Sequence, residues 1–184
     1  MKSPCSNKFE HATRIYRIVE QQIADNVNHV RERIADAAIR SGRTAEDVTC
    51  VAVTKYLPVG SPIYDALFAT GCEDLGESRP QHLMEKIDQW SGPPVRWHMI
   101  GSLQRNKVRK ILPHVALIHS VDSLRLLEAI DRIADEESLP PVPILLEVNI
   151  SGDASKKGLD PNELVPLLDQ SAERYTNVEI RGIM

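Results

Sequence analysis

The chain has 184 residues, of which 42% are hydrophobic and 26% are charged, and its formal net charge is −4 at pH 7. This length suffices for one sizeable core, and the composition is that of a soluble globular protein. The mildly acidic charge argues against a protein built mainly to bind nucleic acid. The sequence shows no signal peptide, no apolar run near the roughly 18 residues of a membrane span and no metal spacing among its three cysteines, so we expect a cytoplasmic protein.

The first predicted element is a long amphipathic helix. Apolar residues recur at three- and four-residue steps from Ile15 to Ala38, and Ser41-Gly42 ends the pattern. A single apolar stripe indicates that the helix packs on another element along one face. We expect residues 1–12 to be flexible and residues 13–184 to form a single domain.

From residue 49 onward, predicted strands alternate with predicted helices. The strands are expected over 49–55, 73–77, 95–100, 115–120, 142–150 and 178–184. The helices between them are expected over 61–71, 80–90, 106–112, 122–137 and 161–174. Such alternation is typical of βαβ units that build an α/β fold with a parallel sheet.

Two architectures fit this pattern, an open doubly wound sheet and a (β/α) barrel. Residues 55–60, which follow the first strand, contain one glycine, whereas a dinucleotide-binding turn needs three. That difference favours the barrel. A complete barrel has eight units, typically in about 250 residues, so we expect a parallel (β/α) barrel that is truncated after six strands and carries an extra N-terminal helix.

The first predicted strand ends in a lysine, Lys55. Because burial of an ammonium group is costly, its head should reach a polar pocket or solvent at the functional edge of the sheet. A partly desolvated lysine there can lose its proton and attack a carbonyl to form a Schiff base. A lysine that merely extends into solvent at a strand end fits the same spacing.

Other predicted strand ends carry polar residues that should meet Lys55 at the same edge. They are Glu77-Ser78, His98, Ser120, and Asn149 with Ser151. Together these groups could line a polar pocket. His98 also fits a hydrogen-bonded core residue, and Asn149 also fits an amide that only fixes the backbone. No metal-binding or serine-hydrolase motif is present.

Two basic segments remain. Residues 104–110 lie at a loop-to-helix junction, where they could contact phosphate or form a solvated helix face. Lys156-Lys157-Gly158 follows the fifth strand, where it could form a surface turn or lend positive charge to an anion.

Several of these segments resemble the pyridoxal phosphate homeostasis protein family. The similarity is carried in order by Val51–Lys55, Trp97–Lys107, Val148–Gly158 and Arg181–Met184, and it extends from about residue 15 to the end. The resemblance implies the N-terminal barrel fold of alanine racemase, with pyridoxal 5′-phosphate held as a Schiff base on Lys55. Beside Lys55, the cofactor-binding residues that we expect are Glu77, His98, Asn149 and Met184.

The family is regarded as a regulator of vitamin B6 and amino-acid pools without catalytic turnover. The resemblance therefore implies a cofactor-binding protein with no catalytic residue, no metal, and no nucleic-acid or membrane partner. A racemase needs a second acid–base group on the opposite face of the cofactor, and alanine racemase takes it from a partner subunit's C-terminal domain. An amino-acid racemase or related enzyme is the alternative, and a cofactor-free scaffold is a second one.

Two departures from the family accompany this resemblance. Ser78 stands where the family has an asparagine, which removes an amide from the cofactor side. The family's phosphate-binding segment, which follows strands seven and eight, has no counterpart in the sequence. The full family fold is expected to be a monomer, whereas we expect this chain alone to bind the cofactor weakly and to self-associate through open sheet edges.

Overall fold

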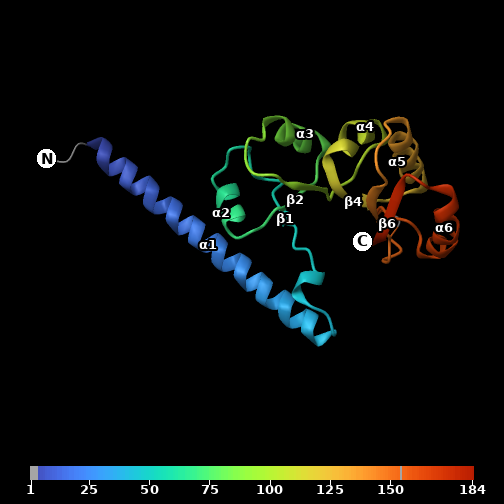
Figure 1. Cartoon of the computed structure of the whole chain (residues 1–184), viewed down its shortest axis with the longest axis horizontal. Coiled ribbons are helices and arrows are strands. Elements are labelled where there is room, and N and C mark those ends of the chain that lie inside the picture. The colour runs from blue at the N-terminus through green and yellow to red at the C-terminus, as the bar shows by residue number, and fades with distance from the viewer. Residues whose placement is uncertain (1–3, 154) are drawn as a thin grey trace. The chain divides into compact units, whose positions relative to one another are not determined.

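A computed structural model of the chain describes residues 4–153 and 155–184 (Figure 1). By its contacts the chain divides into two compact units. The first comprises Met1–Ala52, Tyr56–Asp74 and Ser91–Pro94, and the second comprises Val53–Lys55, Leu75–Trp90 and Val95–Met184. The single domain expected over residues 13–184 stays a prediction.

The first unit begins with the long helix α1, Pro4–Arg40. Residues 4–12 belong to this helix, and no proline or glycine follows Pro4 in that stretch. The flexibility expected for residues 1–12 stays a prediction. Residues 1–3 lie outside the described part of the chain. The helix ends as predicted, because Gly42 adopts a φ of 71° and the Arg43 amide donates to the Ala38 carbonyl at 2.9 Å.

Helix α1 packs against α2, Ile63–Ala69, and against the short helix η1, Ala45–Asp47. This contact supports the predicted packing of one face, but the apolar stripe is only partly covered by the residues that the structure describes. Ile18 remains 60% exposed and Ile39 remains 71% exposed. Within the same described part of the chain, no helix combines the length and apolar character that crossing a lipid bilayer requires.

Six strands form one sheet in sequence order, β1-β2-β3-β4-β5-β6. Their bounds are Ala52–Val53, Asp74–Glu77, Arg96–Met99, Val115–Val121, Val142–Leu146 and Val178–Ile183. The pairs β3–β4, β4–β5 and β5–β6 are parallel. The predicted α/β class and the order of strands and helices are therefore confirmed. Helices α3, α4, α5 and α6 follow β2, β3, β4 and β5, as Figure 1 shows.

Strand β1 is the weakest part of the prediction. We expected a seven-residue strand, 49–55, buried on both faces, but only Ala52 and Val53 are in strand conformation and Val53 is 56% exposed. Because β1 stands at one end of the strand order, β2 is its one neighbour in the described sheet, and its side chains have less to pack on. The backbone pairing nevertheless continues to Thr54, whose amide donates to the Gly76 carbonyl at 2.9 Å.

The helices of the second unit cover one face of the sheet. They are α3 Pro80–Gln89, α4 Val108–Ile111, α5 Leu124–Glu136 and α6 Pro161–Arg174, with short η2 Arg105–Lys107 and η3 Leu112–His114 around α4. Helix α6 has the predicted bounds, whereas the single helix predicted over 106–112 is divided into three short turns. Helix α5 contacts β5 and β6 and buries a stripe that includes Leu127 and Ile130, over the fully buried Ile144.

Candidate functional site

The carboxyl ends of the strands lie at one edge of the sheet, and the hydrogen bonds there set their register. The Thr54 amide bonds to β2, and the Ile100 amide after β3 donates to the Glu77 carbonyl at 2.9 Å. At the other end of the strand order, the Met184 amide donates to the Leu146 carbonyl at 2.9 Å. This edge therefore carries residues from β1, β2, β3 and β6, and all of the predicted cofactor-binding residues belong to the second unit.

Lys55 directly follows Thr54 at this edge, and its side chain is exposed. Exposure of the residue fits the expectation that its ammonium group is kept out of the apolar core. An exposed amine at a strand end is open to attack on a carbonyl compound from solution. The Schiff base on Lys55 stays a prediction.

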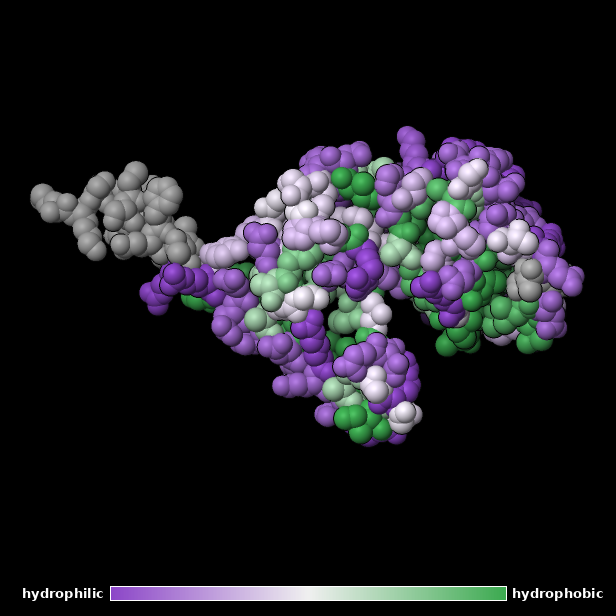
Figure 2. Space-filling model, viewed as in Figure 1, coloured by the Kyte–Doolittle hydropathy of each residue, from purple (hydrophilic) through white to green (hydrophobic). Residues whose placement is uncertain are grey.

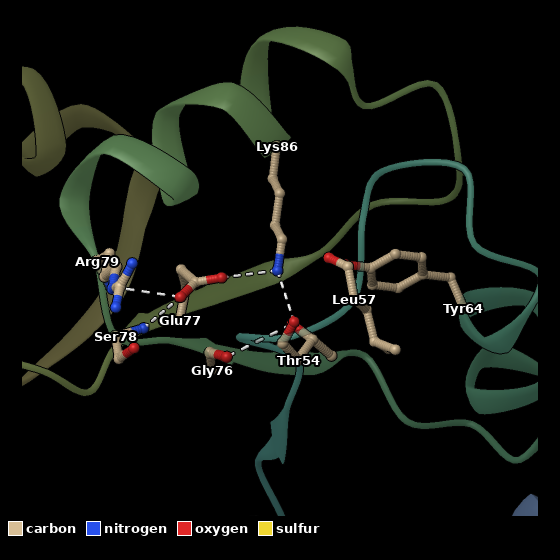
Figure 3. A network of polar contacts seen from close by, with 8 residues as sticks. All are labelled: Thr54, Leu57, Tyr64, Gly76, Glu77, Ser78, Arg79 and Lys86. Carbon is tan, nitrogen blue, oxygen red and sulfur yellow. Dashed lines mark hydrogen bonds and ion pairs between the residues drawn. The ribbon is translucent and has the colours of Figure 1, made fainter.

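Glu77 is engaged in a buried network, which Figure 3 shows. Its side chain is fully buried, and Oε2 lies 2.7 Å from Nζ of Lys86, which reaches it from α3. Its Oε1 accepts hydrogen bonds from the Ser78 amide at 2.6 Å and the Arg79 amide at 3.3 Å. Nζ of Lys86 also donates to the Thr54 carbonyl at 2.7 Å. Both oxygens of the carboxylate are therefore engaged within the protein, and its predicted contact with a cofactor stays a prediction.

The electrostatics of Glu77 follow from the same contacts. Burial alone would raise the pKa of the carboxyl group, but the hydrogen bonds from Lys86 and the Ser78 amide, with the charge of Lys86, hold the pKa below its ordinary value. Glu77 is therefore ionised at neutral pH, and Lys86 is its buried counter-ion.

His98 on β3 pairs with His119 on β4. Nδ1 of His98 lies 2.8 Å from Nε2 of His119, and the two ring centroids are 5.1 Å apart. One nitrogen must donate and the other accept, so the pair shares one proton between these atoms. Burial, and then the neighbouring His98, lower the pKa of His119. The pair is a hydrogen-bonded unit, as the core interpretation of His98 predicted, and it lies near the edge that carries Lys55.

Asn149 organises the loop after β5. Its Nδ2 donates to the Asp153 carbonyl at 2.9 Å, and its Oδ1 accepts from Oγ of Ser151 at 2.8 Å. Gly158 closes against it with a φ of 118°, and a Cβ at Gly158 would lie 2.6 Å from the Asn149 amide nitrogen. The side chain of Asn149 therefore holds the loop backbone at Asp153 and Lys156, in agreement with the alternative interpretation of this residue.

The loop brings Lys157 to a surface hollow beside β3 and β4. Nζ of Lys157 donates to Oγ of Ser102 at 2.6 Å and lies 3.6 Å from Oδ2 of Asp122. The hollow has a volume of about 650 Å³ and is lined by residues 102–106, 122–123, 125–126 and 157. Of the predicted basic segment, Arg109 forms ion pairs with Glu136 and Glu137, as a solvated helix face would.

Three contributors to this edge were missed in the sequence. Lys86 lies three residues after the fully buried Leu83, on the inward face of α3, and a lysine in that stripe was the available signal. His119 gave no signal, because its partner lies 21 positions away on another strand. Gly101 is required by close packing, since a Cβ there would lie 2.3 Å from the Ser78 carbonyl oxygen.

Comparisons with known proteins agree with the resemblance seen in the sequence. No family model matches the chain. It is 37% identical over 164 residues to the pyridoxal phosphate homeostasis protein of Pseudomonas aeruginosa, a match that covers 88% of this chain and 69% of that protein. The protein of the same name from Escherichia coli is 37% identical over 165 residues, with the same coverage. The chain belongs to the pyridoxal phosphate homeostasis protein family.

Three solved structures have a fold similar to that of this chain. A protein from Bifidobacterium adolescentis matches with a TM-score of 0.77 and 35% identity, covering 91% of this chain and 70% of that one. PipY of Synechococcus elongatus, solved with pyridoxal phosphate bound, matches with a TM-score of 0.65 and 36% identity over 82% of this chain and 69% of its own. Alanine racemase from Bartonella henselae matches with a TM-score of 0.63 and 15% identity, and the match covers 89% of this chain and 42% of the racemase. The two proteins therefore share a fold. The predicted relation to the alanine racemase barrel is confirmed.

Proposed function

We propose that the chain binds pyridoxal 5′-phosphate through Nζ of Lys55 and serves in the homeostasis of this cofactor and of amino acids. The observation that carries the proposal is an exposed lysine at the carboxyl end of β1 in a chain 36% identical to PipY, which has been solved with pyridoxal phosphate. When bound, the cofactor supplies an aldehyde that forms a Schiff base with an amine.

The residues present fit such a group. Lys55 offers an accessible amine, and the pair of His98 and His119 offers hydrogen-bonding imidazoles near the same edge. At the far end of the strand order, the Met184 carbonyl accepts from the Val148 amide at 2.9 Å, which places Met184 beside the residue that precedes Asn149. In this proposal Lys55 attaches the cofactor, His98 contacts it, and Asn149 and Met184 bound the site. Glu77 does not contact the cofactor in this proposal, but it holds Lys86 and the amides of Ser78 and Arg79 in place at the edge of the site.

The proposal includes a non-catalytic role. Turnover of an amino acid needs a group that gives or takes a proton on the far side of the cofactor. At the sheet edge, the carboxylate of Glu77 is occupied by Lys86, and His98 is hydrogen-bonded to His119. We therefore expect cofactor binding without racemisation. Incubation with pyridoxal phosphate and an L-amino acid in D2O should give no more D-isomer than a Lys55→Ala control, and a clear excess would favour the racemase alternative.

A spectroscopic titration tests the proposed binding. Wild-type chain titrated with pyridoxal phosphate should develop Schiff-base absorbance, and Lys55→Ala should not. Lys157→Ala is the matched control, because Lys157 is an exposed lysine that follows β5 and binds Ser102 after β3. It should titrate like the wild type. Absence of any such absorbance in the wild type would leave the cofactor-free scaffold as the better interpretation.

We propose further that the protein works in the cytoplasm on a small molecule, without nucleic-acid or membrane partners. The net charge of −4 fits this environment and partner. Fractionation of cells that express the tagged chain would test the location, and recovery in the membrane fraction would contradict it.

Self-association of the isolated chain is also proposed. Figure 2 shows apolar side chains gathered on the part of the face where β6 and α6 lie in Figure 1. Exposed apolar residues in this region include Val165, 64% exposed, and Ile183, 60% exposed on the last strand of the sheet order. An edge strand, such as β6 in the described sheet, can pair with a second copy of the chain. Sedimentation velocity should show dimers or larger species that diminish on dilution, and a monomer at all concentrations would contradict this.

A further inference from the structure

We infer that Lys86, together with Glu77, is a positioning residue that fixes the peptide group from which Lys55 extends. This inference rests on the proposed function of Lys55. Nζ of Lys86 donates to the carbonyl of Thr54 and to Oε2 of Glu77, at 2.7 Å in each case (Figure 3). A residue on α3 thus holds the position immediately before the proposed cofactor lysine.

The geometry of the peptide bond transmits this contact to Lys55. The Thr54 carbonyl and the Lys55 amide belong to one planar peptide group, so a donor that holds the oxygen also orients the nitrogen of Lys55. The other side of Thr54 is held as well, because its amide donates to the Gly76 carbonyl at 2.9 Å. The peptide groups on both sides of Thr54 are therefore restrained, and the second of them fixes the position of the Lys55 Cα from which the side chain extends.

Glu77 links this restraint to the rest of the edge. Its carboxylate accepts from the amides of Ser78 and Arg79 just before α3, and its carbonyl accepts from the amide of Ile100 after β3. The ends of β1, β2 and β3 are therefore connected through one residue and its counter-ion. Lys86 closes the connection to β1, where the strand itself has only two residues in strand conformation.

A contribution to stability does not by itself explain why Lys86 and Glu77 form a buried ion pair. The side chains of Lys86 and Glu77 are 5% and 0% exposed, and a buried ion pair is often no more stabilising than apolar residues of the same volume. An apolar residue in place of Lys86 would fill the same space but would leave the Thr54 carbonyl without this donor. The feature that only the lysine supplies is the hydrogen bond to the residue before Lys55.

Two variants separate positioning from stability. Lys86→Met leaves the carboxylate of Glu77 buried without its counter-ion and should unfold at lower urea concentration than the wild type. The double variant Glu77→Leu/Lys86→Met removes both charges and should regain most of that loss. Neither variant restores a donor to the Thr54 carbonyl. Leu127→Ala, a buried truncation on α5, serves as a control for destabilisation alone.

Two measurements are made on all four proteins. The first is the Kd for pyridoxal phosphate from Schiff-base absorbance, which should rise about tenfold or more in both Lys86 variants and stay within about twofold of the wild type in Leu127→Ala. The second is hydrogen exchange of the Thr54 amide, which should be faster in both Lys86 variants than in Leu127→Ala. A double variant that regains wild-type affinity and slow exchange together with its stability would show that the pair is only structural and would overturn the inference.

Failure of the proposed function would look different. In that case the wild type itself forms no Schiff base, whatever the variants do. The exchange of the Thr54 amide then decides the inference alone: slow exchange in the double variant would overturn the positioning of this peptide, and fast exchange would support it.

Discussion

Glu77 and Lys86 form an ion pair of 2.7 Å in which neither side chain is more than 5% exposed. A pair so completely removed from water cannot exchange its partners for solvent, so loss of either charge leaves the other one uncompensated. The pair therefore couples the stability of this edge of the sheet to the ionisation of a single carboxyl group.

The first prediction is an acid-labile stability that depends on Glu77. Because its pKa is lowered in the folded state, ionised Glu77 contributes stability above its unfolded pKa of about 4.3. That contribution is lost as the pH falls through the lower folded value. Urea unfolding should show a steeper loss of the free energy of unfolding below about pH 4.3 in the wild type than in Glu77→Gln. Equal slopes in the two proteins would contradict the ionised, paired state of Glu77.

A second pH dependence is expected from His119 in a separate window. Its pKa is lowered in the folded state by burial and by His98, so the unfolded chain binds the proton more readily. Stability should fall as the pH drops below about 6.5, the ordinary histidine value, and level off below the folded pKa. In His119→Gln this part of the pH dependence should be weaker. An unchanged slope between about pH 6.5 and 5 would show that His119 titrates alike in both states.

A third prediction concerns two glycines in the loop after β5. Gly158 has a φ of 118° and lies so close to Asn149 that a Cβ would be 2.6 Å from its amide nitrogen. Gly152 has a φ of 66° but nothing within 4 Å of a Cβ. Gly152→Ala should therefore cost about 1 kcal/mol from backbone strain alone, whereas Gly158→Ala adds a clash with backbone and should cost about 2–4 kcal/mol.

Urea unfolding of the two variants checks this difference. Gly158→Ala should also displace Lys157 from Ser102, with which it forms a 2.6 Å hydrogen bond, and increase the hydrogen exchange of residues 149–158. Equal losses in the free energy of unfolding for the two substitutions would mean that the backbone at Gly158 can shift to relieve the clash, and would contradict the prediction.

The sequence was sufficient for those parts of the fold that have a strong local pattern. Pro161 and Arg174 bound α6 as predicted, and the alternation of strands and helices predicted the parallel sheet. The sequence was insufficient where tertiary contacts determine the length and burial of an element. The apolar run of 49–55 predicts a buried strand, but β1 has few neighbours and only two residues in strand conformation.

The candidate site divides in the same way. Lys55 could be found because a charged residue ends an apolar run. Lys86 and His119 could not be assigned roles, since their partners lie 9 and 21 positions away and meet them only in the folded chain. Glu77 was placed correctly at the edge of the sheet, but its burial against Lys86 could be seen only in three dimensions.

Reductive labelling identifies the lysine that forms the Schiff base with pyridoxal phosphate. The chain is mixed with pyridoxal phosphate and reduced with borohydride, and the labelled peptide is identified by mass spectrometry. We expect label on Lys55 and loss of this label in Lys55→Ala. Label on Lys107, Lys156 or Lys157 with none on Lys55, or an unchanged Schiff-base spectrum in Lys55→Ala, would contradict it.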